Sequence, residues 1–418
     1  MIRHVVVLGC FLACVSASVN ITTYEGHKVY KVFPTESQAG ILKTFHDLEG
    51  YDFWGSYHNV STGIQELDLM VTPEQQEYFV KFLKEKNIEY STLVEDLETV
   101  FQAERVQQNS KTASSRISFN SYLRYDEIQT YLLQLVTNYP SLVTVENIGF
   151  TYEGRPIVIA KISSGGQGSR PVIAIEAGIH AREWIAPATA VYIIQQLVEN
   201  SENYDLISHV DWHIVPVTNP DGYEFSHTTT RLWRKTRSRL SSSICIGTDP
   251  NRNFDFYWME GGASSNPCSD TYAGSHGFSE PETSAYHNYI LENKDRIKLY
   301  LATHSYGNYF LYPWGYTEEL PEDWRDLENL VRSANEAQVA AGAPSYTIGS
   351  TTHVLYIAAG GSDDWVKGVG GVKYSYTVEL PGGGIWGFDL PASRILSTVS
   401  SYFPAIRVFG NYIKDNYA

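Results

Sequence analysis

The chain has 418 residues, too many for one domain of ordinary size, and 43% of them are hydrophobic, so it can bury real cores. It carries 31 lysines and arginines against 47 aspartates and glutamates, a net charge of -16 that repels phosphate backbones and anionic bilayers. These values predict a globular protein, with neither nucleic acid nor a membrane surface as its partner.

Residues 1–18, MIRHVVVLGCFLACVSAS, have the pattern of a secretory signal peptide. A basic start at Arg3 is followed by an apolar run over 5–15 and by small residues, which indicates cleavage after Ala17 or Ser18. The alternatives are a membrane anchor or a buried strand, but the apolar run is shorter than the roughly 20 residues that a spanning helix needs. We therefore expect a secreted protein.

A small α+β domain is predicted next. The stretches KVYKVF (28–33) and IQELDLMV (64–71) indicate strands, and residues 37–49 and 73–87 indicate amphipathic helices. Thr72 and Pro73 are typical of the N-cap and first position of the second helix.

Residues 95–120 begin as a helical stretch and become polar and serine-rich, with basic residues at Arg105, Lys111 and Arg116. This composition is typical of an exposed linker that proteases cut after basic residues. A flexible tether between domains is the alternative. A secreted two-domain chain with such a connector favours a zymogen.

From Tyr125 onward, helices alternate with strongly apolar strands. We expect helices over 125–139, 186–200 and 324–342 and a final helical stretch from Arg394 that Pro404 interrupts; strands are expected over 171–177, 210–217, 296–303 and 372–380. Nearly continuous apolar strands flanked by helices predict an α/β domain whose sheet is covered on both faces.

Four cysteines are present, and two of them lie in the predicted signal peptide. The two that remain, Cys245 and Cys268, are expected to form a disulfide, because secreted thiols oxidise. A metal-binding pair or two free thiols are the alternatives.

A candidate metal site lies in AGIHAREW (177–184), where His180 and Glu183 follow an apolar strand. Both side chains are good zinc ligands and a spacing of three lets them reach one ion, but most such pairs are surface neighbours on a helix. His304 ends the strand over 296–303 in the same way, and open α/β sheets place their sites at these strand ends. We therefore predict one Zn2+ per chain, held by these three residues, with a fourth position left for water.

Six stretches together resemble a known family: GIHAREW (178–184), LWRKTR (232–237), PNRNF (250–254), ATHSYG (302–307), LYIAAGGSDDW (355–365) and YSYTVEL (374–380). Over essentially its whole length the chain is similar to zinc carboxypeptidases of the A/B type, which are secreted digestive procarboxypeptidases. The resemblance implies a mixed, mostly parallel twisted sheet with helices on both faces, preceded by a small α+β open-sandwich activation domain. The expected parts are a signal peptide over 1–18, an activation domain with a helical linker over 19–116 and a peptidase domain over 117–418.

The resemblance also implies roles for single residues. Arg252 and Asn251 would bind the carboxylate at the end of a peptide substrate, Glu379 would be the general base, and Arg234 would stabilise the oxyanion. Tyr356 would close over the substrate, and Arg182, Ser305 and Tyr306 would line its subsites. Without the family pattern, the arginines would be interpreted as solvated surface and Glu379 as a member of a buried ion pair.

The resemblance also implies that Asp363 lies at the base of the pocket that holds the last side chain of the substrate. The residue at this position is acidic in B-type members and apolar in A-type members. A buried carboxylate there favours C-terminal lysine or arginine. Gly315 and Thr351 also line the pocket by resemblance, and neither is usual in basic-specific members, so A-type specificity for aromatic or aliphatic residues is the alternative.

The resemblance implies that the activation domain blocks the cleft until a trypsin-like protease cuts near Arg105, Lys111 or Arg116, in the lumen of a digestive tract. Two other interpretations remain: a catalytically silent secreted zinc-binding protein, and a processing enzyme acting on hormones. The complete set of ligands and base disfavours the first, and the long activation segment disfavours the second.

Overall fold

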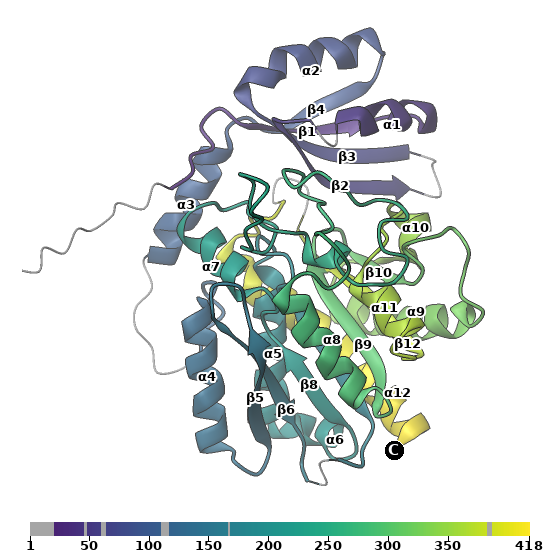
Figure 1. The fold of residues 1–418 in the computed structure, drawn as a ribbon. Helices are drawn as coiled ribbons and strands as arrows, with labels where there is room; N and C mark the ends of the chain where they lie inside the picture. The colour runs from purple at the N-terminus through teal and green to yellow at the C-terminus, as the bar shows by residue number, and fades with distance from the viewer. Residues whose placement is uncertain (1–20, 46–47, 60–63, 110–116, 166–167, 383–386) are drawn as a thin grey trace, which may run out of the picture.

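The computed structural model describes residues 21–45, 48–59, 64–109, 117–165, 168–382 and 387–418. The predicted signal peptide and the basic residues Lys111 and Arg116 lie outside these ranges. The described chain forms a small and a large unit, stacked on one another in Figure 1.

The small unit is a four-stranded antiparallel sheet in the order β2-β3-β1-β4. Its elements are β1 (Lys28–Phe33), α1 (Glu36–Leu42), β2 (Tyr51–Asn59), β3 (Ile64–Val71), α2 (Pro73–Glu85), β4 (Glu89–Val94) and α3 (Leu97–Asn109). Helices α1 and α2 cover the outer face of the sheet, and the strand β2 lies toward the large unit (Figure 1). Thr72 is the N-cap of α2 and Pro73 its first residue, as predicted.

The large unit has an eight-stranded mixed sheet in the order β11-β10-β12-β9-β7-β8-β6-β5. Its strands are β5 (Val143–Phe150), β6 (Pro156–Ile162), β7 (Val172–Ala177), β8 (Asp211–Val215), β9 (Ile297–Ser305), β10 (Tyr309–Tyr312), β11 (Thr347–Ser350) and β12 (Tyr374–Leu380). The four central strands β12, β9, β7 and β8 are parallel, so their carboxyl ends meet at one edge of the sheet.

Helices cover both faces of this sheet. They are α4 (Tyr125–Asn138), α5 (Ile185–Glu199), α6 (Tyr204–Ile207), α7 (Pro220–Thr228), α8 (Pro281–Asn293), α9 (Trp324–Ala340), α10 (Thr351–Val354), α11 (Ser362–Gly368) and α12 (Ala392–Tyr417). Alternate residues of β7 point to opposite faces: Ile173 and Ile175 join one hydrophobic core, and Val172 and Ala174 join the other.

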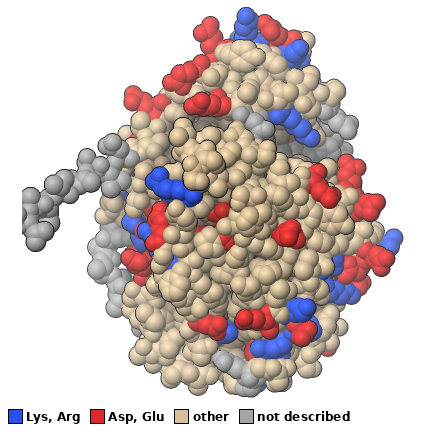
Figure 2. All heavy atoms as spheres, in the orientation of Figure 1, with Lys and Arg blue, Asp and Glu red and all other residues tan. Residues whose placement is uncertain are grey.

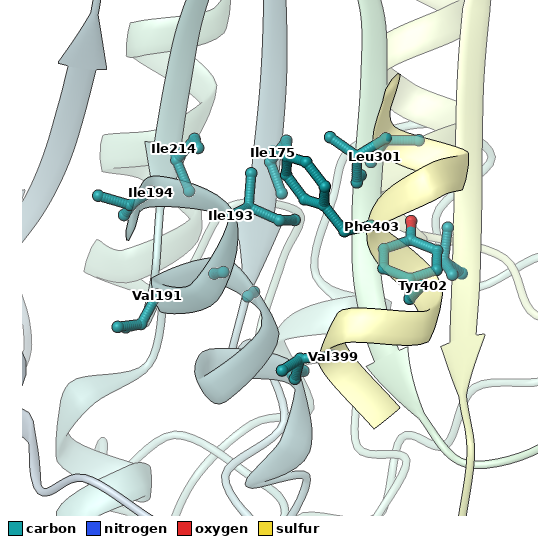
Figure 3. Packing of buried hydrophobic residues seen from close by; sticks show 14 of the residues in the cluster. Ile175, Val191, Ile193, Ile194, Ile214, Leu301, Val399, Tyr402 and Phe403 are labelled. Atoms are coloured by element: carbon teal, nitrogen blue, oxygen red, sulfur yellow. The ribbon is translucent and has the colours of Figure 1, made fainter. Parts of the chain in front are cut away.

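Figure 3 shows the first core, where α5 and α12 lie side by side against the strands. Ile193 of α5 and Phe403 of α12 pack with Ile175 and Leu301 of the sheet. The second core lies under α8 and α11, with Tyr286 and Trp365 among its buried members. The expected α/β fold, with a small α+β domain before it, is confirmed.

Two predicted elements need correction. Pro404 does not interrupt the last helix, which runs unbroken from residue 392 to 417. A proline inside a helix costs about 3 kcal/mol, but Phe403, Ala405 and Ile406 are fully or nearly fully buried, and their packing offsets it. The first helix is shorter than expected and ends at Leu42. Phe45, which follows it, packs against Tyr51 and α2 in the core of the small unit.

A disulfide joins Cys245 to Cys268, as predicted. Among the residues that the structure describes, no helix combines the length and the apolar character that crossing a bilayer requires. Figure 2 shows acidic side chains along the outer edge of the small unit, in line with the net charge of -16.

Candidate active site

The strand order explains why ligands distant in sequence meet. β7 pairs with β9 so that Ala177 lies opposite Thr303, and His180 follows three residues after Ala177. Gly178 makes the turn with φ +64, and a Cβ there would lie 3.2 Å from Val217 Cα, so only glycine fits well. The neighbouring strand β12 places Glu379 in register with His304.

His180, Glu183 and His304 converge on one point. Glu183 Oε1 lies 2.7 Å from His180 Nδ1, and Glu183 Oε2 lies 3.1 Å from His304 Nδ1. The two imidazole Nδ1 atoms are 3.2 Å apart, and all three residues are buried.

These distances fit zinc. Ligand atoms at about 2.0–2.2 Å from a tetrahedral ion stand about 3.3–3.6 Å from one another. Two separations in the triad, 3.1 and 3.2 Å, come close to this range, and the third, 2.7 Å, is shorter. Two imidazole nitrogens that face each other beside a carboxylate need a proton or a cation between them. Two nitrogens and a carboxylate oxygen are a donor set that zinc prefers, and one position remains for water.

Asp249 is a site residue that the sequence did not reveal. Its Oδ1 lies 3.1 Å from His180 Nε2, and its Oδ2 accepts hydrogen bonds from Arg234 Nε and Nη2, at 3.0 and 2.8 Å. Burial would raise its pKa, but Arg234 and His180 outweigh burial and hold it well below the usual range. A histidine ligand held in this way by a carboxylate keeps its orientation and gains basicity. Only its place just before PNRNF hinted at this role.

Glu379 faces the triad from β12. Its Oε2 is buried and has no hydrogen-bond partner among the residues that the structure describes. Burial raises the pKa of this carboxyl to about 8, against the attraction of His304. A bound cation would lower this value again, toward the range in which a general base works near neutral pH.

Arg252 is fixed beside this site. It is 3% exposed, its Nε donates to Gly262 O at 2.9 Å, and its Nη1 donates to Asn251 O at 2.8 Å. Asn251 Oδ1 accepts from Ser362 N at 2.9 Å, which leaves the Asn251 amide NH2 as a donor. Tyr356 is 43% exposed at the rim.

One cavity of about 90 Å³ contains these groups, and Asp363 lines it with Arg252, Glu379 and Thr351. Asp363 is 5% exposed, and its Oδ2 has no hydrogen-bond partner among the described residues. Burial raises its pKa, although hydrogen bonds from the Thr377 side chain and from the backbone act in the opposite direction. Gly315 lies behind the wall, where its N–H donates to Asp364.

The small unit covers the mouth of this cavity. Asp52 Oδ2 accepts a hydrogen bond from Arg182 Nη1 at 2.7 Å, and Tyr306 OH donates to Asp68 Oδ2 at 3.2 Å. Trp54 lines the cavity and packs edge-on against Phe388. Of the three predicted subsite residues, Ser305 and Tyr306 line the cavity, and Arg182 contacts the small unit without lining it.

Helix α3 also docks on the large unit. Arg231 Nε donates to Glu104 at 2.7 Å, and the Arg231 guanidinium lies over the Trp184 ring. Arg105 pairs with Glu98 within the same helix. The stretch up to residue 109 is therefore a helix, as predicted, and it is docked on the large unit. Arg105 lies in this helix, half-buried and ion-paired, not in an exposed linker.

The two units match two family models. Residues 128–405 match the zinc carboxypeptidase model, and residues 30–104 match the carboxypeptidase activation peptide model. The chain belongs to the zinc carboxypeptidase family. It is a metallocarboxypeptidase with an activation peptide, and its triad is suited to zinc.

Relatives carry both A and B names. A carboxypeptidase B of Astacus astacus is 49% identical over 304 residues, 72% of this chain and 100% of that one. A carboxypeptidase B of Rattus norvegicus is 36% identical over 94% of this chain and 95% of its own. The crystal structure of carboxypeptidase A from Helicoverpa armigera superimposes with a TM-score of 0.88 at 31% identity, over 94% of this chain and 98% of that one.

Proposed function

We propose that the activated protein removes single lysine or arginine residues from the carboxyl ends of peptides and proteins. The observation that carries this proposal is the buried Oδ2 of Asp363, which has no partner among the described residues and lines the same cavity as Arg252 and Glu379. Among the described residues no cation pairs with this carboxylate, which is unfavourable for a buried charge, and a guanidinium or ammonium group would compensate it. An uncharged side chain would leave it unpaired.

The terminal carboxylate of the substrate is proposed to bind Arg252 and Asn251. The guanidinium of Arg252 offers parallel donors that match a carboxylate, and its two hydrogen bonds to backbone carbonyls fix its plane. Tyr356, exposed at the rim, is proposed to close over the bound residue. Arg182, Ser305 and Tyr306 are proposed to contact the residues before it.

Zinc bound to His180, Glu183 and His304 would polarise the scissile carbonyl and acidify a water molecule. Glu379, whose carboxylate faces the triad with one oxygen free of hydrogen bonds to the described residues, accepts the proton of the attacking water and returns it to the leaving amine. Arg234 stabilises the charge on the carbonyl oxygen. Two of its nitrogens donate to Asp249, so Nη1 is the donor we assign to this task.

We further propose that the chain is secreted as a zymogen and activated by a trypsin-like protease in a digestive lumen. The disulfide supports an oxidising compartment. The helical, ion-paired Arg105 is a poor substrate for such a protease, which favours cleavage at Lys111 or Arg116. Cleavage after Arg116 would make Ile117 the first residue of the peptidase domain. The boundary at 116/117 stays a prediction.

The test is hydrolysis of peptides that end in Arg, Lys, Phe or Leu, before and after trypsin treatment, with and without a chelator. We expect activity that appears with trypsin, vanishes with the chelator and favours Arg and Lys endings at least tenfold. Faster release of Phe or Leu would replace the B-type assignment with the A-type one. Zinc binding without turnover of any peptide would support the catalytically silent alternative.

A further inference from the structure

A buried carboxylate beneath the cleft is not used by the proposed mechanism. Glu176 lies on β7, is 1% exposed, and is in register with Ala302 of β9. Its Oε2 accepts a hydrogen bond from the hydroxyl of Tyr300, a residue of β9 that is fully buried. A carboxylate in the middle of a sheet needs a partner or a task.

The hydrogen-bonded chain continues to the cleft. The Tyr300 hydroxyl lies 3.0 Å from Ser362 Oγ, and Ser362, also fully buried, is the first residue of α11. The backbone N–H of Ser362 donates to Asn251 Oδ1 at 2.9 Å. Ser362 directly precedes Asp363, whose carbonyl accepts from Ser375 Oγ at 2.7 Å.

Ser362 therefore joins two groups that act on the substrate. Its N–H orients the Asn251 amide, so that the NH2 of Asn251 is left for the terminal carboxylate. Its position at the start of α11 fixes where Asp363 enters the pocket. Because side-chain hydrogen bonds lock rotamers, the contact to Tyr300 holds the start of this helix against the sheet.

We propose that Glu176, Tyr300 and Ser362 form a positioning unit that sets how the C-terminal residue of the substrate is held. None of its three residues lines the cavity, so the unit acts through neighbouring residues. It acts through Asn251 on every substrate and through Asp363 on basic ones. The inference rests on the roles proposed above for Asn251 and Asp363.

Three substitutions test the unit, each in the full chain treated with trypsin. Tyr300→Phe removes the hydroxyl that contacts both other members, and Ser362→Ala removes the next one. Each is expected to raise KM about tenfold for peptides ending in Arg, with kcat changed less than twofold and zinc content unchanged. The KM for Phe endings should rise about threefold, through Asn251 alone, so the preference for Arg over Phe endings should fall about threefold. Glu176→Gln keeps an acceptor for Tyr300 and should change KM less than threefold.

Tyr376→Phe is the matched control. Tyr376 is fully buried on the neighbouring strand β12, and its hydroxyl donates to Leu327 O at 3.1 Å, in the core on the opposite face of the sheet. This variant loses the same atom from the same residue type, and its KM should equal that of the unaltered chain.

A double-mutant cycle distinguishes a coupled positioning unit from independent destabilisation of the structure by each substitution. If the unit is continuous, Tyr300→Phe combined with Ser362→Ala raises KM no further than either change alone. Additive effects would overturn the proposal, and so would a Tyr300→Phe chain that matches the Tyr376→Phe control. If Tyr300→Phe does not fold, Ser362→Ala carries the test against the Tyr376→Phe control.

The two proposals fail in different ways. If the unaltered chain prefers Phe endings, the B-type assignment falls, and the KM comparison is then made on its preferred peptide. A rise of about threefold in that KM would still support the unit, because Asn251 serves every substrate. A loss confined to kcat or to zinc content would contradict it.

Discussion

Two walls of one cleft hold buried carboxylates in opposite ways. On the wall formed by β7 and the loop before PNRNF, Glu183 and Asp249 are fully engaged by imidazoles and by Arg234. On the facing wall, Glu379 and Asp363 each have one buried oxygen without a partner among the described residues.

The difference separates groups that hold the site from groups that act on a substrate. Charged neighbours lower the pKa of the paired carboxylates, whereas burial raises the pKa of the unpaired ones. A paired carboxylate has a fixed position and a fixed charge. An unpaired one is ready to accept a proton or a cation that arrives with the substrate.

Glu379→Gln is the substitution that we expect to have the largest effect on activity. It removes the proposed proton acceptor while it keeps the shape, so kcat should fall about 10²–10⁴-fold with zinc content unchanged. Steady-state hydrolysis of an Arg-ended peptide measures it. Glu282→Gln is the matched control, because burial raises the pKa of Glu282 to about 8 as well, yet it lies on α8 outside the cavity. A Glu379→Gln chain with normal kcat would remove Glu379 from the mechanism.

Asp363→Ser tests the second unpaired group. Loss of the carboxylate should lower kcat/KM about 100-fold for Arg endings and leave Phe endings unchanged or faster, since only a cation needs the charge. Competition between the two peptides in one reaction measures the ratio. Equal losses on both peptides would mean that Asp363 stabilises the pocket but does not select between charged and uncharged substrate side chains.

Asp249→Asn tests the paired wall. The neutral amide should weaken zinc affinity about 10–100-fold, because it orients His180 less firmly. Competition with a chelating dye measures the affinity. Asp211→Asn is the control: Asp211 is 1% exposed and pairs with Arg296, away from the zinc residues. Unchanged zinc affinity in Asp249→Asn would contradict the role of this wall.

Asp52→Ala tests whether the contact between the activation domain and Arg182 helps to cover the cleft. Loss of its ion pair with Arg182 should raise the activity of the uncleaved chain on longer peptides about tenfold or less, because Asp270 lies 3.6 Å from Arg182 as a second partner. Glu66→Ala removes an ion pair with Lys31 inside the activation domain and should leave that activity unchanged. No difference between the two variants would exclude Asp52 as a cover of the cleft.

The metal triad could be predicted from the sequence because each ligand follows an apolar strand that is easy to identify. Parallel strands bring such ends together, so His180 and His304 needed no further information. Asp249 could not be predicted, since its partners arrive from β7 and from the loop that carries Arg234, and short-range patterns do not report such contacts. The contact of Asp52 with Arg182 could not be predicted for the same reason, because it joins two domains.

Parts of the fold escaped prediction for similar reasons. The edge strands β4 and β11 carry mostly half-exposed residues and lack a strong apolar pattern. The unbroken α12 reflects tertiary packing around Pro404, which local propensity does not include.

The most direct test of the central claim is a crystal structure of the trypsin-treated, zinc-loaded protein with free arginine. The account predicts the arginine carboxylate on Arg252 and Asn251, its guanidinium on Asp363 Oδ2, and a metal ion between His180 and His304. A guanidinium that points to solvent, with Asp363 turned into the wall, would contradict it.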